Sequence, residues 1–243
     1  MEIVVHRGAN DVAPENTMAS AKVCADLGVE YVEIDVWRSL DGVHYIMHDP
    51  TLNRTTTGTG AIALRTSRYI DKLDAGSWFA PEFANETVPR LETFLDWARG
   101  RVKVYLDVKT GSLRRIVAMI RERKMEHDVF FWFWSDKRAL KFRRLAPDLP
   151  LKMNSRDPDH VREHKRLFDH QIVEQGPNDA SPAVIETCHE LGIRVMANVF
   201  GEKDAPDADL HGLYDQVIRL GYDMVNLDRP GPFVEYLRKE GLR

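Results

Sequence analysis

The chain has 243 residues and a formal net charge of −4 at pH 7, with 43% hydrophobic and 30% charged residues. This composition is that of an ordinary soluble globular protein that is long enough to bury a sizeable core. The small negative charge argues against nucleic acid as the main partner, because duplex binding requires a basic face. The sequence has no apolar run of about 20 residues, so it predicts no membrane span.

The N-terminus has no pattern of a secretory signal, because Met1 leads directly into the strand-like run Ile3-Val4-Val5. If Met1 is the native start, we expect a cytoplasmic protein. Cys24 and Cys188 are the only cysteines, too few for a disulfide framework and without the spacing of zinc ligands. We expect both to be small buried apolar residues.

Short apolar runs rich in β-branched residues alternate with longer helical patterns along the chain. The predicted strands lie near residues 2–6, 30–36, 102–108, 129–134, 150–153, 170–174, 193–199 and 222–227. The predicted helices lie near residues 16–27, 90–99, 111–124, 136–145, 157–167, 181–191, 209–220 and 231–240. This strict alternation predicts an α/β fold, a (β/α)8 TIM barrel formed as a single domain over residues 1–243. A doubly wound open sheet is the main alternative, since periodicity does not reveal whether a sheet closes.

Residues 43–47 do not fit the alternation. They follow Asp41-Gly42, a strong hairpin signal, so we expect them to fold back antiparallel on the second strand. With a two-residue loop, position 36 faces 47 and Asp35 lies opposite His48. Residues 50–89 then form a long irregular stretch, and connections of this length in compact domains are usually functional. We therefore expect residues 37–89 to be an inserted hairpin and loop over the mouth of the barrel.

Polar side chains occur where the first three predicted strands end, the edge at which TIM barrels place their active sites. They are His6 and Arg7 on the first strand, Glu33 and Asp35 on the second, and Asp107 and Lys109 on the third. Charged groups within apolar strands are costly unless they are paired or bound to a metal. These positions therefore predict a functional site.

The three carboxylates of this set can converge, because Glu33 and Asp35 share one strand face and Asp107 lies on the neighbouring strand. An all-oxygen ligand set selects a hard divalent cation, Mg²⁺ or Ca²⁺. His6 and His48 beside such a cation are typical of acid–base chemistry on a phosphate.

Other positions are open to two interpretations. Asn16 either caps the first helix or reaches the site. Glu174 and Asn198 lie at late strand ends and are weaker candidates for lining a pocket. We expect the aromatic run 130–134 to be part of the core.

The residues singled out so far resemble the glycerophosphodiester phosphodiesterase family, within the phosphatidylinositol phospholipase C-like superfamily. The matching segments are His6-Arg7-Gly8, Pro14-Glu15-Asn16-Thr17, Glu33-Ile34-Asp35, His48-Asp49-Pro50, Leu52-Asn53-Arg54-Thr55-Thr56, Gly58-Thr59-Gly60, Leu73-Asp74-Ala75-Gly76 and Pro89-Arg90-Leu91-Glu92, with weaker similarity at 223–230. The resemblance implies a (β/α)8 barrel with a divalent cation. It also implies hydrolysis of a small-molecule substrate, a glycerophosphodiester, to glycerol 3-phosphate and an alcohol.

Carried over residue by residue, His6 and His48 match the general acid/base pair, and Glu33 and Asp35 match metal ligands. Arg7 and Lys109 match positions that contact the phosphate.

Three segments depart from the family pattern. Asp107 stands where the family usually has Glu. The segment 196–199 replaces a Trp-Thr pair, and Leu227-Asp228 replaces Thr-Asp. The resemblance places the last two segments at the pocket, so they concern the leaving group rather than the chemistry.

Two alternative functions stay open at this stage. One is a lipid-directed phosphodiesterase, of lysophospholipase D or phospholipase C type. The other is a catalytically weak binding protein on the same scaffold. The sequence makes no prediction of the head group, of the oligomeric state, or of whether water or the substrate's glycerol hydroxyl is the nucleophile.

Overall fold

The computed structural model describes residues 1–176, 180–199 and 207–243. The strands are β1 (Glu2–Val5), β2 (Tyr31–Arg38), β3 (His44–Ile46), β4 (Lys103–Val108), β5 (Val129–Trp132), β6 (Lys152–Asn154), β7 (Ile172–Gln175), β8 (Arg194–Val199) and β9 (Met224–Leu227). The helices are α1 (Met18–Leu27), α2 (Ser67–Ile70), α3 (Leu91–Ala98), α4 (Leu113–Glu122), α5 (Asp136–Leu145), α6 (Pro158–Phe168), α7 (Pro182–Glu190), α8 (Asp207–Arg219) and α9 (Pro230–Lys239). Each predicted strand and helix is present within a few residues of its expected bounds.

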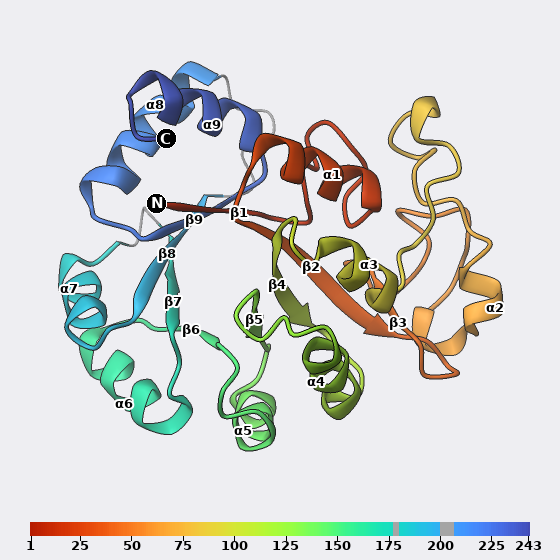
Figure 1. The fold of residues 1–243 in the computed structure, drawn as a ribbon, viewed down its shortest axis with the longest axis horizontal. Coiled ribbons are helices and arrows are strands. Elements are labelled where there is room, and N and C mark those ends of the chain that lie inside the picture. The colour runs from red at the N-terminus through yellow and green to blue at the C-terminus, as the bar shows by residue number, and fades with distance from the viewer. Residues whose placement is uncertain (177–179, 200–206) are drawn as a thin grey trace.

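All strands except β3 pair in parallel in the order β5-β4-β2-β1-β9-β8-β7-β6. A parallel bridge between Phe131 and Leu151, just before β6, joins the two ends of this order. Figure 1 shows the resulting ring of strands with helices around its outside. The sheet is therefore a nearly closed barrel, which confirms the TIM barrel and excludes the open doubly wound sheet.

The side chains of each strand alternate between the inside and the outside of the barrel. On β4, Val104, Leu106 and Val108 pack into the large core beneath the helices, whereas Tyr105 belongs to a separate interior cluster. That interior cluster consists of Val4, Tyr31, Tyr105, Phe130, Ile172, Met196 and Met224. It fills the barrel and leaves the next inward-facing positions, toward the carboxyl ends of the strands, to polar residues.

The hairpin forms where the sequence predicts it, but its register differs by one residue. Val36 pairs with Ile46, and Met47 N donates to Asp35 O at 3.0 Å. Ser39 N donates to Val43 O, so the loop contains three residues, 40–42, and ends at Gly42 with φ of 90°. Asp-Gly thus forms the last two positions of a three-residue loop. The prediction that Asp35 lies opposite His48 is wrong, because Met47 occupies that position.

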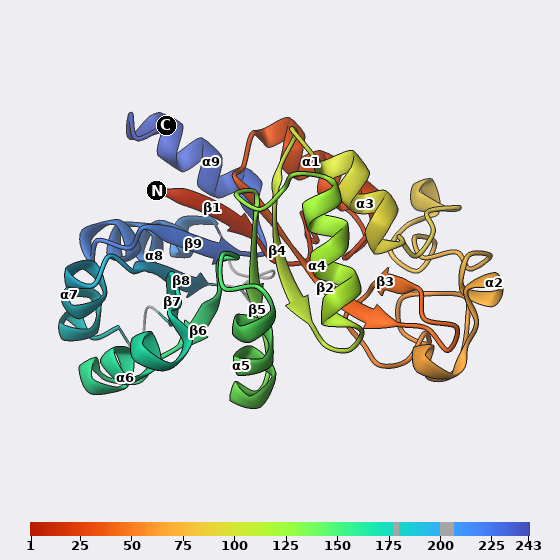
Figure 2. The same ribbon diagram turned by 60° about the horizontal axis from the view of Figure 1, so that its bottom comes forward.

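The segment between β3 and α3 has little regular structure but has a hydrophobic cluster of its own. The cluster contains Tyr45, Met47, Leu52, Ile62, Ile70, Leu73, Ala75 and Val88. Figures 1 and 2 show this segment beside β2 and α3, outside the ring of strands. Across the described parts of the chain, no helix is both long and apolar enough to cross a membrane.

Candidate active site

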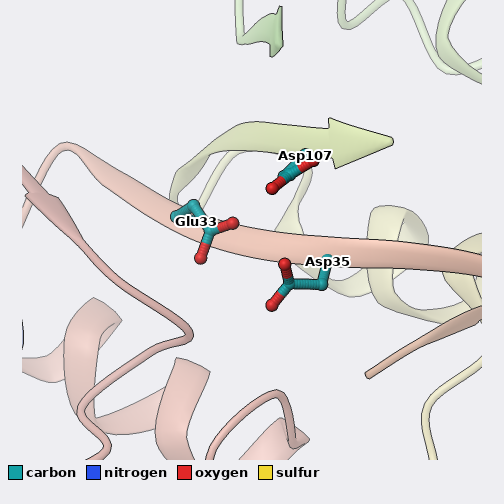
Figure 3. Close-up of side chains that lie close together, drawn as sticks. All are labelled: Glu33, Asp35 and Asp107. Atoms are coloured by element: carbon teal, nitrogen blue, oxygen red, sulfur yellow. The ribbon is translucent and has the colours of Figure 1, made fainter. Parts of the chain in front are cut away.

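Three carboxylates lie together inside the barrel mouth. Glu33 and Asp35 point inward from β2, and Asp107 on β4 stands in register beside Asp35. Figure 3 shows the three side chains converging from these two strands. One oxygen of each lies within 4.8 Å of one oxygen of the other two, and all three side chains are buried. The predicted convergence of these carboxylates is therefore present in the structure.

The pKa values of the cluster reflect burial and mutual repulsion. Burial, and then the charges of Asp35 and Asp107, raise the pKa of Glu33 well above its usual value. Burial also raises the pKa of Asp107 to about 6, against the opposing effect of Lys109. Within residues 1–176, 180–199 and 207–243, the buried Oδ1 of Asp107 has no hydrogen-bond partner. A divalent cation would relieve both the repulsion and this unpaired oxygen, so the donor set fits a metal ion.

Two cationic residues partly offset the carboxylate charge. Lys109 Nζ lies 2.9 Å from Asp35 Oδ1 and also pairs with Asp107. Arg7 N donates to Glu33 Oε2 at 2.9 Å, while Arg7 Nε lies 3.6 Å from Asp35 Oδ2. Burial lowers the pKa of Lys109, but the charges of Asp35 and Asp107 outweigh it and raise that pKa overall. Lys109 therefore stays protonated beside the carboxylates.

A tight turn after β1 presents Arg7 to the site. Arg7 and Gly8 both have left-handed backbone conformations, with φ of 58° and 77°. A Cβ atom at position 8 would lie 2.4 Å from Ser20 Oγ, so only glycine fits between this turn and α1. The close packing brings the backbone N–H of Arg7 within reach of Glu33.

Each of the two predicted catalytic histidines pairs with an aspartate through Nδ1. His6 Nδ1 lies 2.9 Å from Asp228 Oδ1, and His48 Nδ1 lies 2.8 Å from Asp49 Oδ1. Asn10 Nδ2 also donates to Asp228 Oδ1, at 2.7 Å. A carboxylate at Nδ1 fixes the ring orientation and directs Nε2 away from the pair. Both histidines line the same cavity despite the shifted hairpin register.

Arg54 connects the segment that carries His48 to the rest of the site. Its guanidinium donates to both oxygens of Glu15 at 2.8 Å, and its Nε donates to Asp49 Oδ2 at 2.7 Å. Hydrogen bonding from Arg54, followed by that from His48, holds the pKa of Asp49 at about 2. Glu15 also accepts from Arg7 at 3.2 Å. This network fixes His48 relative to Arg7.

The cavity has a volume of about 340 Å³. Its lining comprises His6, Arg7, Glu33, Asp35, His48, Tyr105, Asp107, Lys109, Trp132, Trp134, Lys152, Asn154, Glu174 and Asn226. All seven residues predicted for the site are among them. Glu174 lines the cavity as anticipated, whereas Asn198 contacts it indirectly, by donating to Glu174 Oε1 at 3.2 Å.

Sequence reasoning missed several residues of the site. Trp132 and Trp134 line the cavity although the aromatic run 130–134 was expected in the core, where Phe131 and Phe133 do lie. Lys152 on β6 also lines the cavity, and the sequence did not predict it as a site residue. The sequence did carry a signal for the two tryptophans, because residues two apart on a strand share one face. Trp132 and Trp134 therefore lie on the face opposite to that of Phe131 and Phe133.

Asn16 reaches the site rather than capping the first helix. Its Nδ2 donates to Asp35 Oδ2 at 2.8 Å, and its Oδ1 accepts from Asp35 N at 3.2 Å. Thr17 is the N-cap of α1 and accepts from Ser20 N. Asn16 therefore orients one of the carboxylates of the cluster.

Comparisons with known proteins show the family of the chain. The sequence model of the "Glycerophosphoryl diester phosphodiesterase family" matches residues 6–231. A curated glycerophosphodiester phosphodiesterase of Caldanaerobacter subterraneus subsp. tengcongensis is 26% identical over 251 residues, which cover 98% of this chain and 98% of that protein.

Solved structures show the same fold. The crystal structure of a glycerophosphodiester phosphodiesterase from Agrobacterium tumefaciens has a TM-score of 0.88 and 35% identity, covering 97% of this chain and 99% of that one. An Oleispira antarctica phosphodiesterase in complex with the product sn-glycerol-3-phosphate has a TM-score of 0.80 and 25% identity, covering 98% and 97%. The chain therefore belongs to the glycerophosphoryl diester phosphodiesterase family and is an enzyme of the phosphodiesterase class.

Proposed function

We propose that this enzyme hydrolyses glycerophosphodiesters to glycerol 3-phosphate and an alcohol, using a divalent cation and the pair His6 and His48. The observation that carries the proposal is the meeting of two aspartate-paired histidines and three buried carboxylates in one cavity. The family match and the product found in the Oleispira antarctica phosphodiesterase support the substrate class.

The residues that would hold the cation are Glu33, Asp35 and Asp107, and the all-oxygen set favours Mg²⁺ or Ca²⁺. When bound, a divalent cation there polarises a phosphoryl oxygen and supplies positive charge. Asp107 replaces the longer glutamate expected from the family pattern, and Lys109 holds its carboxylate beside Asp35.

In this proposal, Arg7 and Lys109 bind the phosphate. Both line the cavity and lie beside Asp35. Their charges neutralise phosphoryl oxygens that become more negative in the transition state. Arg7 is suited to this role because Glu15 and Glu33 already fix its side chain and its backbone N–H.

In this proposal, His6 and His48 act as the general acid and the general base. One imidazole accepts a proton from the attacking oxygen, and the other donates a proton to the alkoxide leaving group as the P–O bond breaks. Asp228 and Asp49 hold the rings with Nδ1 occupied, so Nε2 of each ring is the atom that exchanges the proton. The attacking oxygen is that of water or of the substrate's own glycerol hydroxyl.

We also propose that residues 1–243 form one TIM-barrel phosphodiesterase domain, with residues 37–89 as an insertion over the barrel mouth that contributes a wall of the site. The position of His48 in the cavity lining supports this role, as does the hydrophobic cluster within the segment.

The proposal is tested by assaying release of glycerol 3-phosphate from a panel of glycerophosphodiesters. The panel contains the glycerol, inositol, choline and ethanolamine diesters. The protein is first treated with EDTA and then supplied with Mg²⁺ or Ca²⁺. We expect activity that is lost with EDTA and restored by one of these ions. If neither ion restores activity on any diester of the panel, the result would contradict the proposal.

A further inference from the structure

A second group of polar side chains lines the cavity in addition to the seven residues predicted for the site. We call it the polar wall, and it consists of Lys152 and Asn154 on β6, Glu174 on β7 and Asn226 on β9. In the strand order, β6 and β7 lie across the barrel from β1 and β2, which carry His6, Glu33 and Asp35. Lys152, Asn154 and Glu174 therefore face the phosphate-binding side across the cavity. Asn226 lies on the strand next to β1, where it pairs with Val4, so the wall extends round to the side of His6. An ester substituent of the phosphate that points away from the carboxylates would lie along this wall.

The polar wall carries no net charge. Lys152 Nζ lies 2.6 Å from Glu174 Oε2, and the Lys152 side chain is only 2% exposed. Asn198 donates to the other oxygen of Glu174. The remaining members, Asn154 and Asn226, are neutral amides. A ligand beside this wall would find hydrogen-bond donors and acceptors but no uncompensated charge.

Asn226 has hydrogen-bonding capacity that the described residues leave unused. It is 2% exposed and lines the cavity. Its buried Oδ1 has no hydrogen-bond partner among the residues that the structure describes. Buried polar atoms are almost always paired, and an unpaired one calls for a partner from outside the protein. A ligand that donates a hydrogen bond, such as a hydroxyl, meets this requirement.

The aromatic residues beside the wall are poorly suited to bind a quaternary ammonium group. Such cations bind over aromatic faces, and Trp132 and Trp134 are the cavity's indoles. Lys152 Nζ already lies 4.7 Å from the ring centre of Trp132, and Lys109 Nζ lies 5.5 Å from that of Trp134. A lysine of the protein therefore already occupies one face of each indole, and that face is not available to a cationic head group.

We propose that the polar wall hydrogen-bonds the hydroxyls of the leaving alcohol, so that the enzyme prefers glycerophosphodiesters whose second alcohol is an uncharged polyol, such as glycerol or a cyclitol. This inference rests on the proposed function and names its substrate class. Trp134, which is 73% exposed, provides an apolar surface at the mouth for the C–H face of such a group.

The test compares kcat/KM on four diesters. Two have polyol leaving groups, glycerophosphoglycerol and glycerophosphoinositol, and two have cationic ones, glycerophosphocholine and glycerophosphoethanolamine. We expect the native enzyme to favour the polyol pair by about 10-fold or more. Asn226→Ala and Asn154→Ala should each lower kcat/KM on the polyol pair by about 3- to 10-fold, the effect of one lost hydrogen bond, and change the cationic pair less than 2-fold.

Asn53→Ala is the matched control, because Asn53 carries the same amide outside the cavity lining, where it accepts from Gly60 N. It should leave the ratio between polyol and cationic substrates unchanged. Equal rates on the two pairs, a preference for choline, or a uniform loss on all four diesters in Asn226→Ala would overturn the inference. Inactivity of the native enzyme on all four would instead contradict the proposed function.

Discussion

His6 Nδ1 lies 2.9 Å from Asp228 Oδ1, although the two residues are 222 positions apart in the chain. The contact forms because β1 and β9 are neighbours in the barrel and both end at its mouth. It joins one of the proposed catalytic groups to the last strand, and it is matched across the site by the pair of His48 and Asp49.

Replacement of Asp228 by Asn should impair catalysis without unfolding the protein. The amide keeps the shape of the carboxylate but no longer stabilises the protonated ring of His6. We expect kcat to fall by about 10²-fold, with a smaller change in KM, and the acid limb of the pH–rate profile to move. The measurement is a steady-state pH profile of both proteins. An unchanged profile and kcat would show that Asp228 does not act through His6.

Replacement of Glu33 by Gln should stabilise the metal-free protein while abolishing its response to metal. Burial and two neighbouring carboxylates disfavour the charge on Glu33, so the neutral amide removes repulsion. We expect the thermal midpoint in EDTA to equal or exceed that of the native chain, by up to about 4 °C. Added Mg²⁺ or Ca²⁺ should raise the midpoint of the native chain only. A metal-induced rise of equal size in Glu33→Gln would count against Glu33 as a ligand.

The metal-free protein should lose stability between about pH 4 and pH 6 because of Asp107. Its pKa is 3.8 in an unstructured chain and about 6 in the fold, so the folded state holds the proton to higher pH. The free energy of unfolding contributed by this group therefore falls as pH rises through that window, by about 3 kcal/mol in total. The check is the difference in thermal midpoint between the native chain and Asp107→Asn, in EDTA, at pH 4 and pH 7.

The thermal midpoint of Asp107→Asn should rise relative to that of the native chain as pH rises, because the asparagine does not titrate. The affinity for Mg²⁺ or Ca²⁺ should rise over the same pH window, because the cation competes with the proton. A midpoint difference that is constant with pH would contradict the raised pKa of Asp107.

Replacement of Gly8 by Ala should destabilise the protein and misplace Arg7. The new Cβ would lie 2.4 Å from Ser20 Oγ, and the backbone at this position has φ of 77°. We expect a loss of more than about 1 kcal/mol in the free energy of unfolding. Under conditions in which the variant is folded, its activity should fall as well, because this turn carries the Arg7 N–H that donates to Glu33. Denaturant unfolding together with a rate measurement tests both effects, and Gly192→Ala serves as control for the glycine backbone, since no atom lies within 4 Å of a Cβ there.

The strands, the helices and the charged strand ends could be predicted because burial imposes a period on each element. The inward alternation that places Glu33, Asp35 and Asp107 together follows from the same rule. The register of the hairpin could not be predicted, because Asp41-Gly42 fits both a two-residue and a three-residue loop. One residue of difference was enough to replace His48 by Met47 opposite Asp35.

Long-range partners were the other part that the sequence could not reveal. Asp228 and Lys152 acquire their roles only through the closure of the barrel, which brings β9 beside β1 and β6 opposite it. Trp132 and Trp134 were assigned to the core because five consecutive aromatic residues obscure the alternation of the strand. The inward position of Trp132 is evident from its pairing with Asp107 in the register of β5 against β4.

The most direct test of the central claim is the turnover of His6→Ala and His48→Ala with the best diester and the activating cation. The matched control is His189→Ala, because His189 also pairs with an aspartate, Asp223 at 3.0 Å, but does not line the cavity. The proposed mechanism predicts that kcat falls by about 10²- to 10⁴-fold in each of the first two variants and by less than 2-fold in the control. Near-native turnover in both His6→Ala and His48→Ala would contradict it.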